Sequence, residues 1–333
     1  MKERDAQLNS SEKVASDRST SGGILDQIEN VEHTIAHHIR EGRFQRSLSL
    51  IAGLSSVVAG LEVSYEHYRG SYSNPVMYTP VVLSGALFMS GVSGAANRRA
   101  ARTILPVVSA LTLADCLIGF GFHVRGIQRK PGGWQLPIFN IIMGPPIFAP
   151  LLFGTSAYLG LVASFLRRED SSQKTSRVPV PAWSKLLPRQ LLGDEITVNQ
   201  ELREGRFQKH LALATAASAS FSGVEALYSH YKNNFKYKAQ WSPIVIAAVL
   251  STVALGSIGS PKVAKKLLPA ASALAIVDGS VGFYYHARGV ARRPGGLKHP
   301  FYNIMYGPPI FAPLLFAACG FLGLLASMLR RES

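Results

Sequence analysis

Two carboxylates and two histidines occur near the ends of long apolar segments, and the same set recurs later in the chain. Glu62 precedes His67 in the segment GLEVSYEHY, and Asp115 precedes His123 in DCLIGFGFHVRG. Imidazole and carboxylate groups are ligands of Zn, Fe or Mn, and a pair of histidines suits a haem iron. The candidate metal ligands, with haem or a divalent transition metal as the candidate cofactor, are His67, His123, Glu62, Asp115, His230, His286, Glu225 and Asp278.

Helical spacing limits which of these side chains can share one site. At 1.5 Å per residue, Asp115 lies about 12 Å below His123, and Glu62 lies at a similar depth. Glu62 and His67 are about 140° apart around a helix, so they meet at one site only where that helix bends or ends. Two hypotheses therefore stay open: a metal or haem site, and a buried polar network that locks the helices together.

A basic loop and a proline-rich motif follow His123. The loop RGIQRKPGGW offers cations to a carboxylate, a phosphate or a propionate, or else to lipid phosphates. The motif GPPIFAPLLF cannot lie inside a regular helix, which predicts that residues 136–143 lie along the membrane interface and that a helix begins at the prolines. The candidate anion-binding residues are Arg125, Arg129, Lys130, Arg288, Arg292 and Arg293, and the candidate structural residues are Asn140, Gly144, Pro145, Pro146, Asn303, Gly307, Pro308 and Pro309.

The elements that position these residues are apolar helices. Charged residues make up 17% of the chain, below the roughly 25% of soluble domains. Residues 131–166 and 300–329 contain no Asp, Glu, Lys or Arg. A helix that crosses a bilayer needs about 20 such residues. The formal charge of +15 is spread in short clusters between the apolar runs, which is typical of membrane loops and predicts no nucleic-acid partner.

The second part of the chain repeats the first. Residues 41–168, the first copy, align without a gap with residues 204–331, the second copy, and 53 of the 128 positions are identical. Each copy contains four apolar segments. The sequence therefore predicts an all-α membrane protein with eight transmembrane helices, arranged as two tandem parallel four-helix repeats. The predicted spans are 47–68, 79–97, 103–124 and 143–166, then 210–231, 242–260, 266–287 and 306–329.

An amphipathic helix is expected before each repeat. Ile24, Ile28, Val31, Ile35 and Ile39 follow helical spacing, and Val198 and Leu202 repeat the last two before the second copy. The pattern is typical of a helix that lies in the membrane interface, or else of a solvated helix that packs on the bundle. The four predicted units are a polar N-terminal tail with an interfacial helix (1–38), the first repeat (39–168), a cytoplasmic linker with an interfacial helix (169–202) and the second repeat (203–333).

The distribution of Lys and Arg predicts the orientation. We count 16 of them near the spans on one side and 11 on the other, so both termini are predicted to face the cytoplasm. The polar, Ser-rich segment 1–23 predicts no cleavable signal peptide. We therefore expect a multi-pass integral membrane protein, in a bacterial inner membrane.

Three functional hypotheses remain. The first is a haem- or metal-binding, redox-associated membrane subunit with one outward-facing His/carboxylate site per repeat. The second is a small-molecule or ion transporter with a site between the pseudo-symmetric halves. The third is a structural scaffold for another membrane or periplasmic subunit. No Walker, Rossmann, Ser-His-Asp or CxxC pattern supports an enzyme, and the lipid bilayer is the one partner that all three share.

Overall fold

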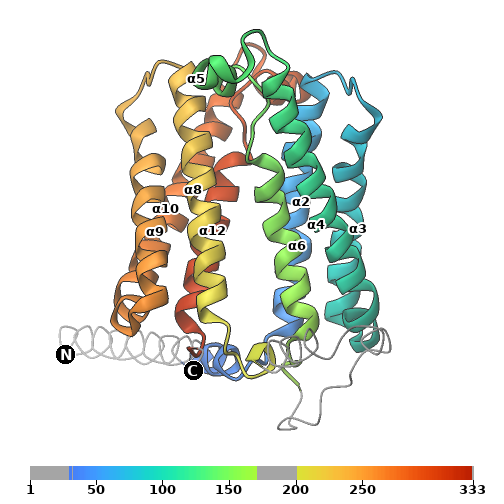
Figure 1. Ribbon diagram of the computed structural model, residues 1–333, viewed down its shortest axis with the longest axis vertical. Coiled ribbons are helices and arrows are strands. Elements are labelled where there is room, and N and C mark those ends of the chain that lie inside the picture. The colour runs from blue at the N-terminus through green and yellow to red at the C-terminus, as the bar shows by residue number, and fades with distance from the viewer. Residues whose placement is uncertain (1–29, 32, 171–200, 332–333) are drawn as a thin grey trace, which may run out of the picture.

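The structure is a computed structural model that describes residues 30–331 except 32 and 171–200. Within these residues the regular elements are helices, apart from one isolated bridge between Arg43 and Arg167. Figure 1 shows them as an elongated bundle. The expected positions of Ile24, Ile28 and most of the 169–202 linker lie outside the described residues.

Four long helices form the first half of the bundle. Residues 33–40 are helical and lead into them. The chain then forms α2 (Gln45–Arg69), α3 (Thr79–Ala96), α4 (Arg98–Gln128), the short α5 (Pro137–Ile142) and α6 (Ala149–Phe165).

Four corresponding helices form the second half. Their bounds match those of the first half when the two copies are aligned, except that a π-helical turn, Val263–Leu267, precedes the third long helix. The helices are α8 (Gln208–Lys232), α9 (Ser242–Gly259), α10 (Leu268–Ala291), α11 (Pro300–Met305) and α12 (Ala312–Met328).

The protein is an all-α membrane protein. In the part of the chain that the structure describes, five helical stretches are long and apolar enough to cross a bilayer: those that contain α2, α3, α4, α9 and α10. The helices α6 and α12 are apolar but have only 17 residues each. Much of the surface of these helices is apolar and exposed, as expected for helices surrounded by lipid.

Each half is a square of helices, and the two squares meet along one side. In the first half α2 and α4 each pack against both α3 and α6, so α2 and α4 lie on a diagonal. Across the middle, α6 contacts α8 and α12 contacts α2. Buried apolar residues of both halves, such as Leu48, Leu159, Leu211 and Leu325, belong to one cluster. The halves therefore share a core.

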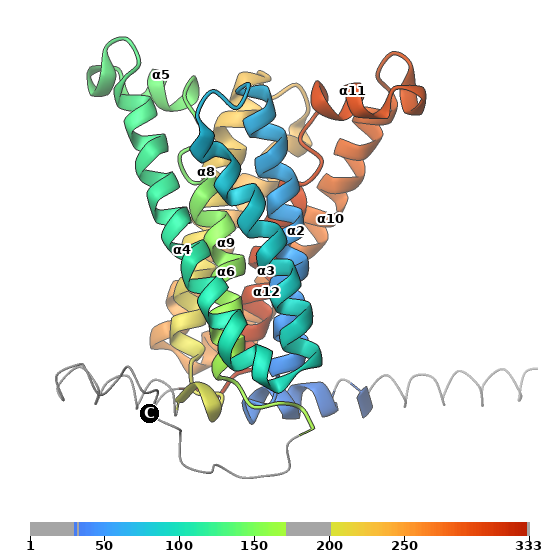
Figure 2. The ribbon, with the colours of Figure 1, turned by 90° about the vertical axis from the view of Figure 1, so that its right-hand side faces the viewer.

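The bundle has two different ends. We call the end at which α2 begins and α6 ends the basic end, and the opposite end the loop end. In Figure 2, α4 and α10 spread apart towards the loop end, where α5 and α11 lie at the two outer tips.

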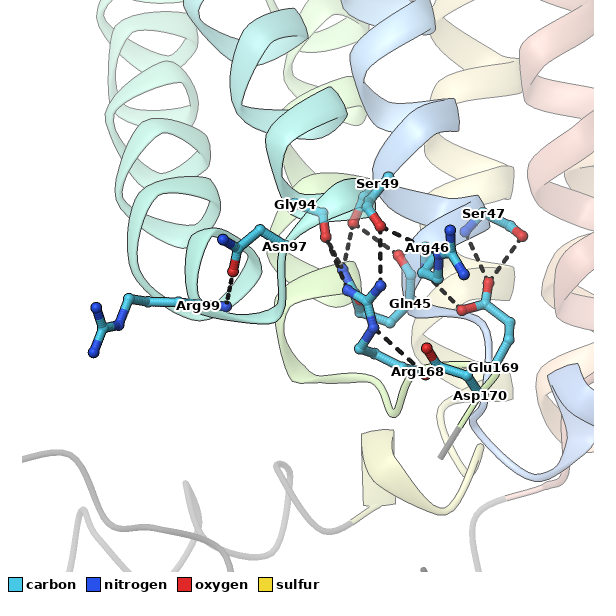
Figure 3. Close-up of polar contacts among 11 residues, drawn as sticks. Gln45, Arg46, Ser47, Ser49, Gly94, Asn97, Arg99, Arg168, Glu169 and Asp170 are labelled. Carbon is cyan, nitrogen blue, oxygen red and sulfur yellow. Dashed lines mark hydrogen bonds and ion pairs between the residues drawn. The ribbon is translucent and has the colours of Figure 1, made fainter. Parts of the chain in front are cut away.

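A polar network closes the basic end of the first half (Figure 3). The buried Gln45 amide donates to Ser49 Oγ (2.8 Å) and to the carbonyl of Gly94 (3.2 Å). Arg168, just beyond α6, donates to Gln45 Oε1 (3.2 Å) and thereby joins three helices. The Glu169 carboxylate accepts from the backbone N–H groups of Arg46 (3.0 Å) and Ser47 (2.8 Å), which caps the start of α2.

Two glycine turns bring the halves into contact at the same end. Gly42 and Gly205 have φ angles of +69° and +73°, a region that L residues with a side chain rarely adopt. A Cβ atom on Gly42 would collide with the carbonyl oxygen of Arg203. The turn 41–43 therefore packs directly against the turn 203–205, with backbone touching backbone.

Two predicted helix boundaries differ from the structure. The third helix begins at Arg98 rather than at residue 103, because the Asn97 side chain caps it by accepting from the N–H of Arg99 (2.8 Å). The fourth long helix begins at Ala149 rather than at the prolines. Pro145 and Pro146 have no N–H to donate, and the backbone from Met143 to Phe148 runs non-helically into the bundle instead.

Candidate functional site

The interrupted segment between α5 and α6 is held in place by buried polar side chains. Asn140 is fully buried, and its amide donates to the carbonyls of Pro131 (3.0 Å) and Gly133 (2.7 Å). Asn303 makes the equivalent bonds to Pro294 and Gly296 at 3.2 and 2.8 Å. These bonds fasten the Pro-Gly-Gly turn to the short helix that follows it, so the motif has a structural role at both positions.

The histidines of α4 and α10 hold the next part of the segment. His123 Nδ1 lies 2.6 Å from the carbonyl oxygen of Pro146, and His286 Nδ1 lies 2.6 Å from that of Pro309. A carbonyl oxygen only accepts, so Nδ1 carries the proton and Nε2 keeps a free lone pair. The same arrangement orients histidines that bind metals through Nε2.

His67 and Asp115 contact the start of the neighbouring helix α3. His67 Nδ1 lies 2.6 Å from the carbonyl oxygen of Met77, and Thr79 donates to Asp115 (2.6 Å). In the second half the Asp278 side chain is bonded to Ser242. His230, the counterpart of His67, lies beside the Phe235 ring. Among the residues that the structure describes, no group of three or more His, Cys, Asp or Glu side chains is placed to hold a metal ion.

The two remaining carboxylates reach across the middle of the molecule. Glu225 of α8 accepts from the backbone N–H of Phe148 (3.1 Å) and lies near that of Ala149, at the start of α6. Glu62 of α2 lies near the backbone N–H of Phe311, the corresponding residue at the start of α12. Each half thus places a carboxylate at the N-terminus of the interrupted helix in the other half. We call Glu62 and Glu225 the reciprocal caps.

Local sequence explains why these caps come from far away. The first N–H groups of a helix have no partner within the helix. Phe148 and Phe311, at the N-cap positions of α6 and α12, have no side chain that could accept a hydrogen bond. A carboxylate also interacts favourably with the positive end of the helix dipole. The ring of Phe148 stacks on Phe221 of the other half, with centroids 4.5 Å apart, and holds the helix start near Glu225.

A third glutamate lies between the reciprocal caps. Glu66 is close enough to act electrostatically on both Glu62 and Glu225. It lies 3.8 Å from the guanidinium of Arg69 and also interacts with Lys232 of the other half. One oxygen of Glu62, Oε2, is fully enclosed and has no hydrogen-bond partner in the structure. A carboxylate oxygen in this position can bind a proton or a small cation.

Two tyrosines line the same region. The buried Tyr65 donates to the carbonyl of Gly307 in the other half (3.4 Å), and Arg69 lies over its ring. Lys232 lies over the ring of Tyr228. The site between the halves therefore combines three carboxylates, two tyrosines and two cations, and both interrupted helices start there.

The candidate anion-binding residues are more dispersed. Arg125, Arg129, Arg288 and Arg292 are exposed, and the Lys130 side chain is half-buried and acts electrostatically on Lys232. Arg293 is half-buried, and its Nε is enclosed without an acceptor. Of this set, Lys130 comes nearest to the site between the halves.

Comparison with known proteins adds no relative: no protein family, no curated protein and no solved structure matches the chain. The function must therefore be argued from the geometry.

The sequence alone did not single out Glu66, Arg69 and Lys232. Comparing the copies highlights residues that are identical in both, whereas Glu66 matches Ser229 and Arg69 matches Lys232. Helical spacing could have identified Glu66 and Arg69, because residues 62, 65, 66 and 69 fall on one face of α2.

Proposed function

We propose that the protein is a transporter of protons or small cations, with its site between two pseudo-symmetric halves. In this proposal eight helices cross a bacterial inner membrane as two tandem four-helix repeats, residues 39–168 and 203–333, and both termini face the cytoplasm. The basic end is then the cytoplasmic end, as expected from the positive-inside rule, and the carboxylates lie towards the opposite side of the membrane.

The reciprocal caps are the observation that carries this proposal. Ionisable side chains inside a membrane protein are costly, and they mark ion or proton pathways. Transporter sites commonly lie where interrupted helices of two repeats meet. Glu62 and Glu225 meet both conditions, because each ends at the start of an interrupted helix of the other half.

Binding of a proton or cation would change how the halves interact. A hydrogen bond to a charged group contributes about 1.5–3 kcal/mol, so the two caps together contribute about 3–6 kcal/mol. A two-state equilibrium shifts from 1:99 to 99:1 with about 5.5 kcal/mol. Neutralising the carboxylates would therefore weaken one of the contacts between the halves by an amount that can shift their arrangement. Glu66 would pass the ion to the reciprocal caps, and the nearby cations Arg69 and Lys232 would control the charge of the Glu66 carboxyl group.

The test is ion flux into vesicles that contain the purified protein. We expect a pH- or Na⁺/K⁺-sensitive dye to report flux under an imposed gradient, and the double variant Glu62→Gln/Glu225→Gln to lower the rate at least about tenfold, which is about 1.4 kcal/mol. Glu169→Gln is the matched control, since it changes a helix-capping glutamate that lies at the basic end. Absence of H⁺, Na⁺ and K⁺ flux in the wild type would refute the proposal.

A haem or metal site is a second candidate, favoured by one observation. His67 and His123 both bond a carbonyl through Nδ1 and are close enough to interact electrostatically, which leaves two Nε2 atoms free. Under this hypothesis the purified protein has a Soret band or stoichiometric Fe, Zn or Mn, which His67→Ala and His123→Ala remove and His33→Ala and His37→Ala do not. A colourless, metal-free protein rules it out. Failure of both tests leaves the scaffold hypothesis.

A further inference from the structure

Three arginines from the two halves gather at the basic end. Arg98 and Arg102 lie on the first turns of α4, and Arg203 lies in the helical turn that precedes α8. We call these three residues the arginine cluster. Arg203 is half-buried, and its Nε is fully enclosed without an acceptor. Partial burial lowers the pKa of Arg203, and the nearby positive charges of Arg102, Arg98 and Arg167 lower it further.

Nearby acidic groups are engaged elsewhere. The first turn of α4 contains no acidic residue, although cations are disfavoured at the positive end of a helix dipole. Glu204, next to Arg203 in the chain, lies 3.3 Å from Arg206. Like charges collected at the start of a helix are stabilised by an anion that binds among them.

The depth of the cluster indicates which anion this is. Ile104, Val107 and Leu111 of α4 are exposed apolar residues that face lipid, and they begin just after Arg102. At 1.5 Å per residue the arginines lie only about 3–9 Å from the start of this surface, at the level of the lipid headgroups. Basic pockets between helices on the cytoplasmic side of membrane proteins bind anionic headgroups.

We propose that the arginine cluster binds the phosphate group of an anionic membrane phospholipid, and that this lipid bridges the two halves. Arg98 and Arg102 hold it from the first half, and Arg203 holds it from the second. In the alignment of the two copies, the arginine cluster corresponds to Pro261, Lys265 and Arg40. This counterpart has two cations instead of three. One strong lipid site per chain is therefore expected rather than two.

The test is a titration of the full-length protein, delipidated in a neutral detergent, with dioleoyl phosphatidylglycerol, followed by native mass spectrometry. We expect Arg98→Gln and Arg102→Gln each to raise the dissociation constant about fivefold, the effect of one basic residue near an anionic headgroup. Arg99→Gln is the matched control, because Arg99 is adjacent in sequence and its side chain points away from the polar network of the bundle (Figure 3). We expect it to leave the constant unchanged.

Two results would overturn the proposal. An effect of Arg99→Gln as large as that of Arg102→Gln would mean that only the overall surface charge attracts the lipid. Displacement of phosphatidylglycerol by inorganic phosphate at millimolar concentration would identify the ligand as free phosphate. Arg203→Lys keeps the charge but loses the planar fork that binds phosphate with two bonds. If this variant melts at the wild-type temperature, its weaker lipid binding supports the site, and unchanged binding removes Arg203 from it.

Discussion

Replacing Glu225 by alanine should loosen the start of α6, a helix that belongs to the other half of the molecule. The N–H group of Phe148 loses its acceptor, and the start of α6 loses a carboxylate that interacts favourably with the helix dipole. We expect the free energy of unfolding to fall by about 2 kcal/mol. Amide hydrogen exchange should rise at residues 148–152 and stay unchanged at the start of α12.

Glu62→Ala should give the mirror result. Exchange should rise at residues 311–315 and stay unchanged at the start of α6, because Glu62 lies at the start of α12. The loss in the double variant should differ from the sum of the two single losses, because Glu62 and Glu225 interact electrostatically with each other and with Glu66. Thermal unfolding in detergent measures the loss for each variant.

The control for this pair is Glu169→Ala, which removes a cap within one half. Its effect should be confined to the start of α2, where Glu169 accepts from Arg46 and Ser47. For Glu225→Ala, increased exchange in α8 rather than in α6 would contradict the reciprocal arrangement. For Glu62→Ala, the contradicting result is increased exchange in α2 rather than in α12.

Valine in place of Gly42 should prevent the halves from closing at the basic end. The positive φ alone costs a residue with a side chain about 1–2 kcal/mol, and the new Cβ would overlap the Arg203 carbonyl in the opposing turn. We expect a total loss of at least about 3 kcal/mol, measured as a lower midpoint of thermal unfolding. Gly205→Val should behave alike, since its Cβ would lie 2.6 Å from the carbonyl oxygen of Arg40.

Two further variants separate backbone strain from contact between the halves. Asparagine tolerates positive φ better than valine, so any loss in Gly42→Asn reports mainly the clash between the turns. Gly85→Ala is the control, because a Cβ there meets nothing within 4 Å. Alanine is the better helix former, and we expect this variant to be slightly more stable than the wild type. Wild-type stability of Gly42→Val would show that the turns do not pack together.

The sequence predicted the helices better than their contacts. Hydropathy located the apolar helices, because burial in lipid demands long uncharged segments. It misplaced the start of α6, because the prolines were expected to open the helix, whereas the chain becomes helical only at Ala149, where Glu225 accepts from the N–H of Phe148. That acceptor lies on α8, far along the chain, and no local pattern reveals such a pairing.

The candidate site was predicted in part for the same reason. Comparing the copies pointed to Glu62 and Glu225, but not to what each one binds. His123 and Pro146 were both noted from the sequence, yet their hydrogen bond depends on how α4 packs beside the interrupted segment. Pairings of this kind follow from helix packing, which a hydropathy pattern does not specify.

The reciprocal caps also bear on how the chain is made. During synthesis α6 is complete before α8 emerges from the ribosome, so the N–H groups at its start have no carboxylate to bind. An unsatisfied backbone group in the hydrocarbon region costs several kcal/mol. The start of α6 must therefore remain near water or the insertion machinery until the helix with Glu225 arrives. A nascent chain released soon after α6 would leave the N–H groups at the start of that helix without the Glu225 carboxylate.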